Sequence, residues 1–260
     1  MRIIDSHCHI DDKSYDKDRA EAVQRAVEAG VAAMVVVGIT PKNCERVVAL
    51  AERHPECWCS VGVHPHDASS CSEDALARLR ELAASERVVA WGECGLDFNR
   101  MFSPRELQEH WFSRQMEIAA ELGMPVILHE RDSEGRLLEM LRDHAGKCQR
   151  GVVHCFSGTP DDLAGYLDLG FHIGITGVLT QKERGKDLRA MVGDIPRDRI
   201  LIETDAPYLT PAPQKNRHRR NEPAFVVSVL DKLAEVLGED REVLARRTWD
   251  NTCELFGITP

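Results

Sequence analysis

Histidine and carboxylate residues recur in this chain in short motifs at the ends of apolar runs. The first motif, IIDSHCHI at residues 3–10, places His7 and His9 one residue apart, with Asp5 two residues earlier. Because successive side chains of a strand point to opposite faces, these three polar groups share one face. Burying two imidazoles on one face is costly unless they bind something, and a divalent metal ion is a partner that suits them.

Further polar residues follow other apolar runs, at the positions where predicted strands end. They are His64 and His66 in VGVHPH, Glu93 in WGECGLD, His129 in PVILHER, His154 in VVHCFSG, and Glu203 and Asp205 in LIETDAP. A single histidine at a strand end is usually a hydrogen-bonded structural residue, and this is the interpretation we favour for His66. Several such groups converging on one place favour a metal site instead.

The mixture of ligands indicates which metals, and how many, the site would hold. Imidazoles combined with carboxylates suit Zn²⁺ or Mn²⁺, with Mg²⁺ as a further choice. Four histidines and two or more carboxylates exceed what one catalytic ion uses, so we expect two divalent ions that share a water. Glu93 is central in strand order and is the expected bridge between them.

The elements that must position these groups alternate between strand and helix. Strands are predicted at residues 3–10, 32–39, 58–64, 88–95, 125–129, 151–156, 171–176 and 200–204. Helices are predicted at residues 16–29, 42–53, 73–84, 104–122, 134–144, 160–168, 183–192, 224–237 and 240–256. This pattern is typical of a (β/α)₈ TIM barrel, whose active sites lie at the carboxyl ends of the strands. An open doubly wound sheet is the rival, but no G-x-G-x-x-G follows the first strand.

Composition limits the class of protein further. The 260 residues fit one α/β domain over residues 1–260, and no linker divides them. The net charge of −10 argues against wholesale electrostatic capture of nucleic acid, although bound cations can reverse the local sign. Nine cysteines without a C-x-x-C pair indicate reduced thiols. Without a signal peptide or an apolar run of about 20 residues, we expect a cytoplasmic monomer with no membrane contact and no obligate protein partner.

Together these motifs resemble the TatD family of metal-dependent hydrolases, within the amidohydrolase-like barrel superfamily. The matching stretches are IIDSHCHID, GVHPHD, GECGLDFNR, PVILHER, HCFSG, GITG, LIETDAPYL and RRNEPAFV, in family order from residue 3 to about residue 256. The resemblance implies divalent-metal-dependent DNase activity, including removal of nucleotides from the 3′ end of single-stranded DNA. It also implies that one ion is held by His7, His9 and Asp205, and the other by His129 and His154, with Glu93 shared.

The expected reaction is hydrolysis of a phosphodiester by a water that the ions activate. Asp205 is expected to take the proton of this water or to orient it. Glu203 is the second predicted catalytic group, either ordering water or touching metal or substrate. Asp5 is interpreted as a support that fixes imidazole tautomers.

Contacts to a nucleic-acid substrate are predicted from basic and aromatic residues near the expected barrel mouth. His64, Arg131, Arg219 and Arg220 are the candidates for phosphate, the last two from the basic segment KNRHRR at residues 215–220. Trp91, Phe98, Phe156 and Tyr208 are candidates for stacking on bases, although core packing is preferred for Trp91 and Phe156.

Two other functions stay open at this point. The same metal pair could hydrolyse an amide or ester, as in an aminoacyl-tRNA deacylase, because fold and metals alone do not decide the substrate. A non-catalytic nucleic-acid-binding or metal-binding protein ranks lower, since a pure binder does not need the potential base Asp205.

Overall fold

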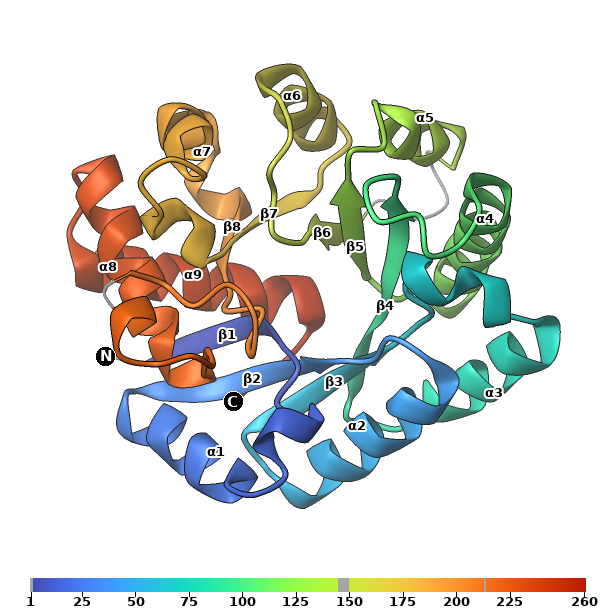
Figure 1. The fold of residues 1–260 in the computed structure, drawn as a ribbon, viewed down its shortest axis with the longest axis horizontal. Helices are drawn as coiled ribbons and strands as arrows, with labels where there is room; N and C mark the ends of the chain where they lie inside the picture. Colours follow the sequence, from blue (N-terminus) through green and yellow to red (C-terminus); the bar gives the residue numbers. More distant parts are fainter. Residues whose placement is uncertain (1, 145–149, 213) are drawn as a thin grey trace. The chain divides into compact units, whose positions relative to one another are not determined.

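The structure is a computed structural model that describes residues 2–144, 150–212 and 214–260. Within these residues the strands form one eight-stranded sheet in sequential order, and every described pair is parallel (Figure 1). The strands are β1 Ile3–Cys8, β2 Val31–Val37, β3 Cys57–Val61, β4 Val88–Asp97, β5 Val126–Arg131, β6 Gly151–Val153, β7 His172–Ile175 and β8 Ile200–Ile202. A further parallel bridge joins Cys8 to Ala206, just beyond β8.

Helices alternate with these strands along the chain. They are α1 Arg19–Glu28, α2 Pro41–Arg53, α3 Glu73–Leu82, α4 Arg105–Leu122, α5 Arg136–Asp143, α6 Pro160–Asp168, α7 Lys186–Met191, α8 Val226–Leu237 and α9 Arg241–Phe256. The α/β fold is therefore the predicted (β/α)₈ TIM barrel. The predicted elements all exist, and their ends differ from the expectation by only a few residues.

The chain divides into two compact units. The first unit contains residues up to Val36 together with Ile173–Pro260, and the second contains Val37–His172. The single domain predicted for residues 1–260 stays a prediction. In the first unit, α9 packs against β1 and β8, and every residue of β1 is buried. This burial includes the polar residues Asp5, Ser6 and His7, which therefore need partners inside the protein.

In the second unit, α2 packs against β3 and α4 packs against β4 (Figure 1). Trp91 of β4 is fully buried, and its indole N–H donates to Oε1 of Gln115 on α4. Phe156 is also buried, at 2% exposure. The core interpretation of these two aromatic residues is thus confirmed.

The helix starts show how the sequence sets the element boundaries. Thr159 caps α6 by accepting from the backbone N–H of Asp162, whose side chain accepts in return from the backbone N–H of Thr159. Pro160 then occupies the first turn, where its missing N–H costs nothing. The helix start predicted at residue 160 is therefore correct.

None of the described helices combines the length and the apolar character that crossing a membrane requires. The eight cysteines within the described residues are free thiols, and most of them are buried. Burial raises the pKa of Cys57 to about 12, which keeps this thiol protonated at neutral pH.

Candidate metal centre

Three predicted ligand side chains converge in the first unit, where the chain leaves β1 and β8. Nε2 of His7 lies 3.2 Å from Nε2 of His9, and Oδ1 of Asp205 lies 3.7 Å and 3.4 Å from these two atoms. The backbone fixes this arrangement, because the N–H of Asp205 donates to the carbonyl of His7 and the N–H of His9 donates to the carbonyl of Ala206. Two imidazoles and one carboxylate thus point at a common position.

The spacing of these atoms fits a divalent ion. Ligand atoms 2.0–2.1 Å from a tetrahedral ion lie about 3.3–3.4 Å from one another. The observed separations of 3.2, 3.4 and 3.7 Å bracket this value. The donor set of His7, His9 and Asp205 therefore fits a metal such as Zn²⁺ or Mn²⁺.

Asp5 lies beside these ligands in β1 and contacts Thr204, just beyond β8. Its carboxylate accepts from the backbone N–H of Thr204 at 2.8 Å and from the hydroxyl of Thr204 at 2.6 Å, and its contact with His7 is to the backbone N–H. Burial raises the pKa of Asp5 to about 8 despite these hydrogen bonds. These contacts tie β1 to the end of β8, and the role of fixing an imidazole tautomer or ordering water stays a prediction.

Glu203 is fully buried in the first unit, where Gly174 of β7 makes room for it. A Cβ atom at Gly174 would overlap the carboxylate of Glu203. The hydroxyl of Ser6 lies 3.5 Å from Oε2 of Glu203. The GITG motif therefore serves to accommodate this carboxylate beside β7.

In the second unit, two glycines let β4 approach β5 closely at Glu93. Gly92 and Gly95 have φ values of +136° and +145°, and a Cβ at either would overlap a backbone oxygen of β5. The register pairs Gly95 with His129. As a result, Nδ1 of His129 lies within hydrogen-bond distance of Oε1 of Glu93, at 2.8 Å.

His64 and His154 complete the predicted set in this unit. Nε2 of His64 lies 3.2 Å from Nδ1 of His129 and 3.6 Å from Oε1 of Glu93. His154 follows β6 directly, is buried at 5% exposure, and donates its backbone N–H to the carbonyl of Leu128. His154 thus lies just beyond β6 and His64 beyond β3, whereas Glu93 and His129 lie within β4 and β5.

Known proteins match almost the whole chain. The model of the TatD related DNase family matches residues 4–257. The chain belongs to this TatD family. It is 44% identical over 254 residues to a 3′-5′ ssDNA/RNA exonuclease TatD of Rahnella sp., covering 96% of this chain and 97% of the relative. A relative of the same name from Cronobacter sakazakii is 44% identical over 257 residues, covering 98% and 97%.

A solved structure supports the same assignment. The TatD homologue YJJV of Escherichia coli K12 has a TM-score of 0.90 and 31% sequence identity, covering 99% of both chains. The TatD resemblance and the barrel fold predicted from the motifs are confirmed. Family membership makes the chain a metal-dependent nuclease, a hydrolase of phosphodiester bonds.

One residue of this TatD site was missed by the sequence reasoning. Oδ2 of Asp97, at the end of β4, lies 3.1 Å from Nε2 of His129 and 2.8 Å from Nε2 of His66. Burial opposes the charge on Asp97, but the hydrogen bonds from His129 and His66 outweigh it and hold the pKa well below the usual range. The GLD of GECGLDFNR contains this group, and the signal was a carboxylate two residues beyond the predicted strand end.

Asp97 explains the roles of two histidines. Burial lowers the pKa of His129, but hydrogen bonds to Asp97 and Glu93 outweigh burial and raise it to about 9. His66 donates to Asp97, which accords with the structural role we favoured for it. The nitrogens of His64, His66 and His129 all lie within 4.8 Å of one another, so this face carries a dense group of ligand atoms.

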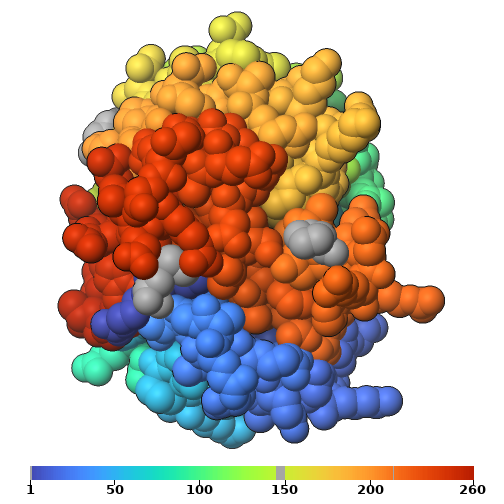
Figure 2. Space-filling model, turned by 90° about the vertical axis from the view of Figure 1, so that its left-hand side faces the viewer, coloured from blue at the N-terminus to red at the C-terminus, as the bar shows by residue number. Residues whose placement is uncertain are grey.

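The predicted phosphate-binding arginines differ in what they contact. In the first unit, Arg220 forms ion pairs with Asp18 at 2.7 Å and Glu222 at 2.9 Å, and its guanidinium lies 4.1 Å from the ring centroid of Tyr15. Arg219 is exposed, in the segment after β8 that lies at the surface, coloured orange in Figure 2. The guanidinium of Arg220 is thus engaged in ion pairs within the protein, whereas the side chain of Arg219 is exposed to solvent.

In the second unit, Arg131 ends β5 with a half-buried side chain. The backbone N–H of Phe98 donates to its carbonyl. Its guanidinium enters no ion pair with the described residues. Its place two residues beyond His129 keeps it a candidate for phosphate.

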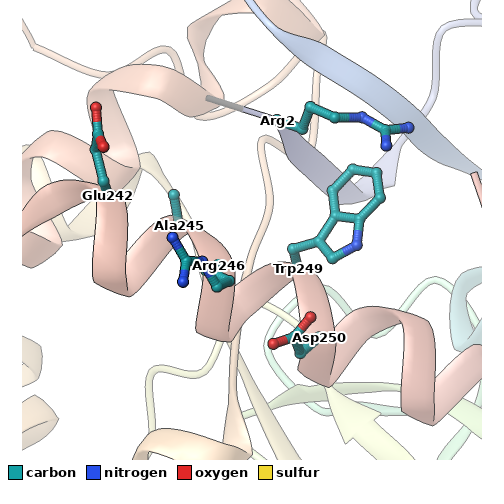
Figure 3. A pocket seen from close by; sticks show the side chains of 6 residues that line it. All are labelled: Arg2, Glu242, Ala245, Arg246, Trp249 and Asp250. Atoms are coloured by element: carbon teal, nitrogen blue, oxygen red, sulfur yellow. The ribbon is translucent and has the colours of Figure 1, made fainter.

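A pocket of about 410 Å³ lies away from these residues, on α9 of the first unit. Figure 3 shows the Trp249 ring beside Arg2, whose guanidinium lies 4.5 Å from the ring centroid. The other lining residues are Glu242, Ala245, Arg246 and Asp250. Since Arg2 precedes β1 at the end opposite to His7, this pocket is not part of the TatD metal centre.

Proposed function

We propose that this chain is a divalent-metal-dependent exonuclease that removes nucleotides from the 3′ end of single-stranded DNA. Relatives at 44% identity carry the name 3′-5′ ssDNA/RNA exonuclease, and they match the chain over almost its full length. The observation that carries the proposal is the convergence of His7, His9 and Asp205 on one position with separations suited to a divalent ion.

We propose two ions, held by two sets of side chains. The first set is His7, His9 and Asp205, and the second is His129 and His154, with Glu93 shared. Divalent ions there would polarise the phosphate and lower the pKa of water.

The residues of the chain then divide the remaining tasks. An Oδ atom of Asp205 accepts the proton of the attacking water, and Glu203 orders this water from its buried position beside β7. Nε2 of His64 donates to a phosphate oxygen of the substrate. Arg131 and Arg219 contact neighbouring phosphates, since both lack ion pairs with the described residues. The same role for Arg220 stays a prediction, because its guanidinium binds Asp18 and Glu222.

The main experiment uses metal-free protein reloaded with Zn²⁺, Mn²⁺ or Mg²⁺. Single-stranded DNA labelled at its 5′ end should be shortened progressively from the 3′ end, and a 3′-phosphorylated or duplex end should slow the reaction. Elemental analysis should give two ions per chain, and His154→Ala should reduce this number. One ion per wild-type chain would contradict the two-metal centre.

Asp205→Asn separates chemistry from binding. The amide keeps an oxygen ligand but cannot accept the proton, so turnover should fall about 100-fold or more while part of the metal binding remains. Unchanged turnover would remove Asp205 from the reaction.

An amide or carboxylic ester substrate, such as an aminoacyl-tRNA, is the competing proposal. The same metal-loaded protein is therefore assayed with ester and amide substrates. Hydrolysis of these substrates without cleavage of DNA would contradict the nuclease proposal. The cytoplasmic location and the monomeric state stay predictions.

A further inference from the structure

The loop between β4 and α4 presents an aromatic ring to solvent beside His66. Phe102 is 66% exposed, and its neighbour Met101 is 43% exposed. The ring centroid of Phe102 lies 4.8 Å from that of His66, with an edge-to-face angle of 84°. Two adjacent apolar side chains are therefore exposed in one loop, where they are available to a ligand.

Hydrogen bonds hold both ends of this loop. At its start, Oδ1 of Asp97 accepts from the backbone N–H groups of Asn99 and Arg100. At its end, the fully buried hydroxyl of Ser103 donates to the carbonyl of His66 and accepts from the backbone N–H of Ser69. The backbone on both sides of Phe102 is therefore fixed, and its ring stays exposed to solvent.

A side-chain hydrogen bond also links the loop to the segment after β5, and the backbone of Met101 in the loop is strained. Nδ2 of Asn99 donates to Oδ2 of Asp132, beyond β5, at 2.6 Å. Met101 has a φ of +51°, in the left-handed region that a non-glycine residue enters only when the surroundings impose it. Such strain is typical of segments that are fixed for binding rather than for packing.

A cation lies two residues before the exposed ring on the same loop. Arg100 is exposed, and its guanidinium forms no ion pair with any of the described residues. An aromatic ring beside an available cation is the combination that binds single-stranded nucleic acid, since the ring stacks on a base and the cation contacts the backbone.

The same loop is connected to a predicted metal ligand. Asp97, which begins the loop, accepts from Nε2 of His129, and His66, which contacts Phe102, donates to the same carboxylate. A base on Phe102 would thus lie one nucleotide or a few from the phosphate being cleaved.

We propose that Phe102 stacks on a base of the single-stranded substrate close to its 3′ end, with Arg100 contacting the adjacent phosphate. The proposal rests on the nuclease function proposed above and adds the residue that recognises the base. Because any base has a π-face, the contact favours unstacked single strands without selecting a sequence.

The test combines substitution of Phe102 with removal of single bases from the substrate. Wild type and Phe102→Ala are compared on an oligonucleotide and on versions with one abasic tetrahydrofuran residue at each of the last four positions. For wild type, kcat/KM should fall about 5- to 100-fold at one of these positions, which is the range of one base–aromatic stack. Phe102→Ala should show this loss on the intact oligonucleotide and no further loss at that abasic position.

Further variants separate stacking from other roles of the ring. Phe102→Trp should retain wild-type kcat/KM, whereas Phe102→Leu, which is apolar but lacks a π-face, should behave like Phe102→Ala. Leu122→Ala, which removes another exposed apolar side chain of the second unit, is the matched control and should leave kcat/KM unchanged.

The outcomes distinguish this proposal from the nuclease proposal. If Phe102→Ala remains as sensitive as wild type to every abasic position, the stacking role is overturned while the nuclease function stands. If Phe102→Ala changes the sedimentation coefficient of the protein, the ring is a contact between copies of the chain and the proposal is again wrong. If wild type cleaves none of the oligonucleotides, the nuclease function itself fails.

Discussion

Oδ2 of Asp97 accepts a hydrogen bond of 3.1 Å from Nε2 of His129. The hydrogen bond fixes the ring so that its other nitrogen, Nδ1, faces Glu93 at 2.8 Å. A carboxylate that holds a ligand histidine in this way sets its tautomer and raises its basicity. Asp97 is therefore a positioning residue for the predicted ligand His129.

Asp97→Asn should lower metal affinity and turnover about 10- to 100-fold, which is the usual cost of losing such a partner. The amide keeps only one accepting oxygen, whereas Asp97 uses one oxygen for two backbone N–H groups and the other for two histidines. Titration of metal-free protein with Zn²⁺, followed by a kcat measurement at saturating metal, checks both effects. Asp74→Asn, on an exposed turn of α3, is the control, and wild-type metal affinity in Asp97→Asn would contradict the assignment.

The two neighbouring arginines of the segment after β8 should behave in opposite ways. Arg219→Ala should weaken binding of single-stranded DNA. The plot of log K, the association constant, against log salt concentration should become less steep by about 0.7, the value for one contact to a single strand. Arg220→Ala should instead lower the free energy of unfolding, because it removes one of the two arginines, Arg220 and Arg25, that pair with Asp18 and Glu222. DNA binding at several salt concentrations and urea unfolding, measured on both variants, separate the roles. A loss of stability in Arg219→Ala with unchanged DNA binding would reverse this interpretation.

The Asp18–Arg220 pair also predicts a dependence of stability on pH. Hydrogen bonds from Arg220 and Arg25 hold the pKa of Asp18 well below its usual range. A carboxyl group with a lowered pKa in the folded state contributes stability above its unfolded pKa of about 3.9, and this contribution is lost as pH falls. Wild type should therefore exceed Asp18→Asn in free energy of unfolding by about 1 kcal/mol at pH 7, because Asp18 is partly exposed. Urea unfolding from pH 7 to pH 3 should show the difference shrinking below pH 4, and a constant difference would contradict the ion pair.

The sequence predicts the barrel well because its elements are encoded locally. A strand buried on both faces reads as an apolar run, so β2 stands out, and the alternation of side chains in β1 places His7 and His9 together. The same reasoning fails where distant segments decide. β4 continues to Asp97 because Asp97 pairs with Arg131 of β5, a register that no local pattern contains.

Arg220 and Phe102 illustrate the same limit. A basic run predicts contact with phosphate, but Arg220 finds Asp18 more than two hundred residues earlier in the chain. An aromatic residue is normally expected in a core, and nothing in the sequence says that Phe102 would be held in solvent. Residues whose role depends on exposure or on a distant partner need the structure.

Gly174 provides the sharpest test of the buried Glu203, because a Cβ at Gly174 would overlap its carboxylate. Gly174→Ala should destabilise the protein by about 1–3 kcal/mol, the usual cost of overpacking, and should also reduce turnover by displacing Glu203. Adding Glu203→Ala removes the overlap, so the double variant should regain most of the stability lost through Gly174→Ala without regaining turnover.

Urea unfolding of both single variants and the double variant gives the coupling between the two positions. Gly193→Ala is the control, since a Cβ there meets no atom within 4 Å and should leave stability unchanged. Additive losses in the double variant would show that Gly174 acts independently of Glu203. A coupling close to the full cost of Gly174→Ala would establish that β7 carries a glycine at this point in order to accommodate the carboxylate.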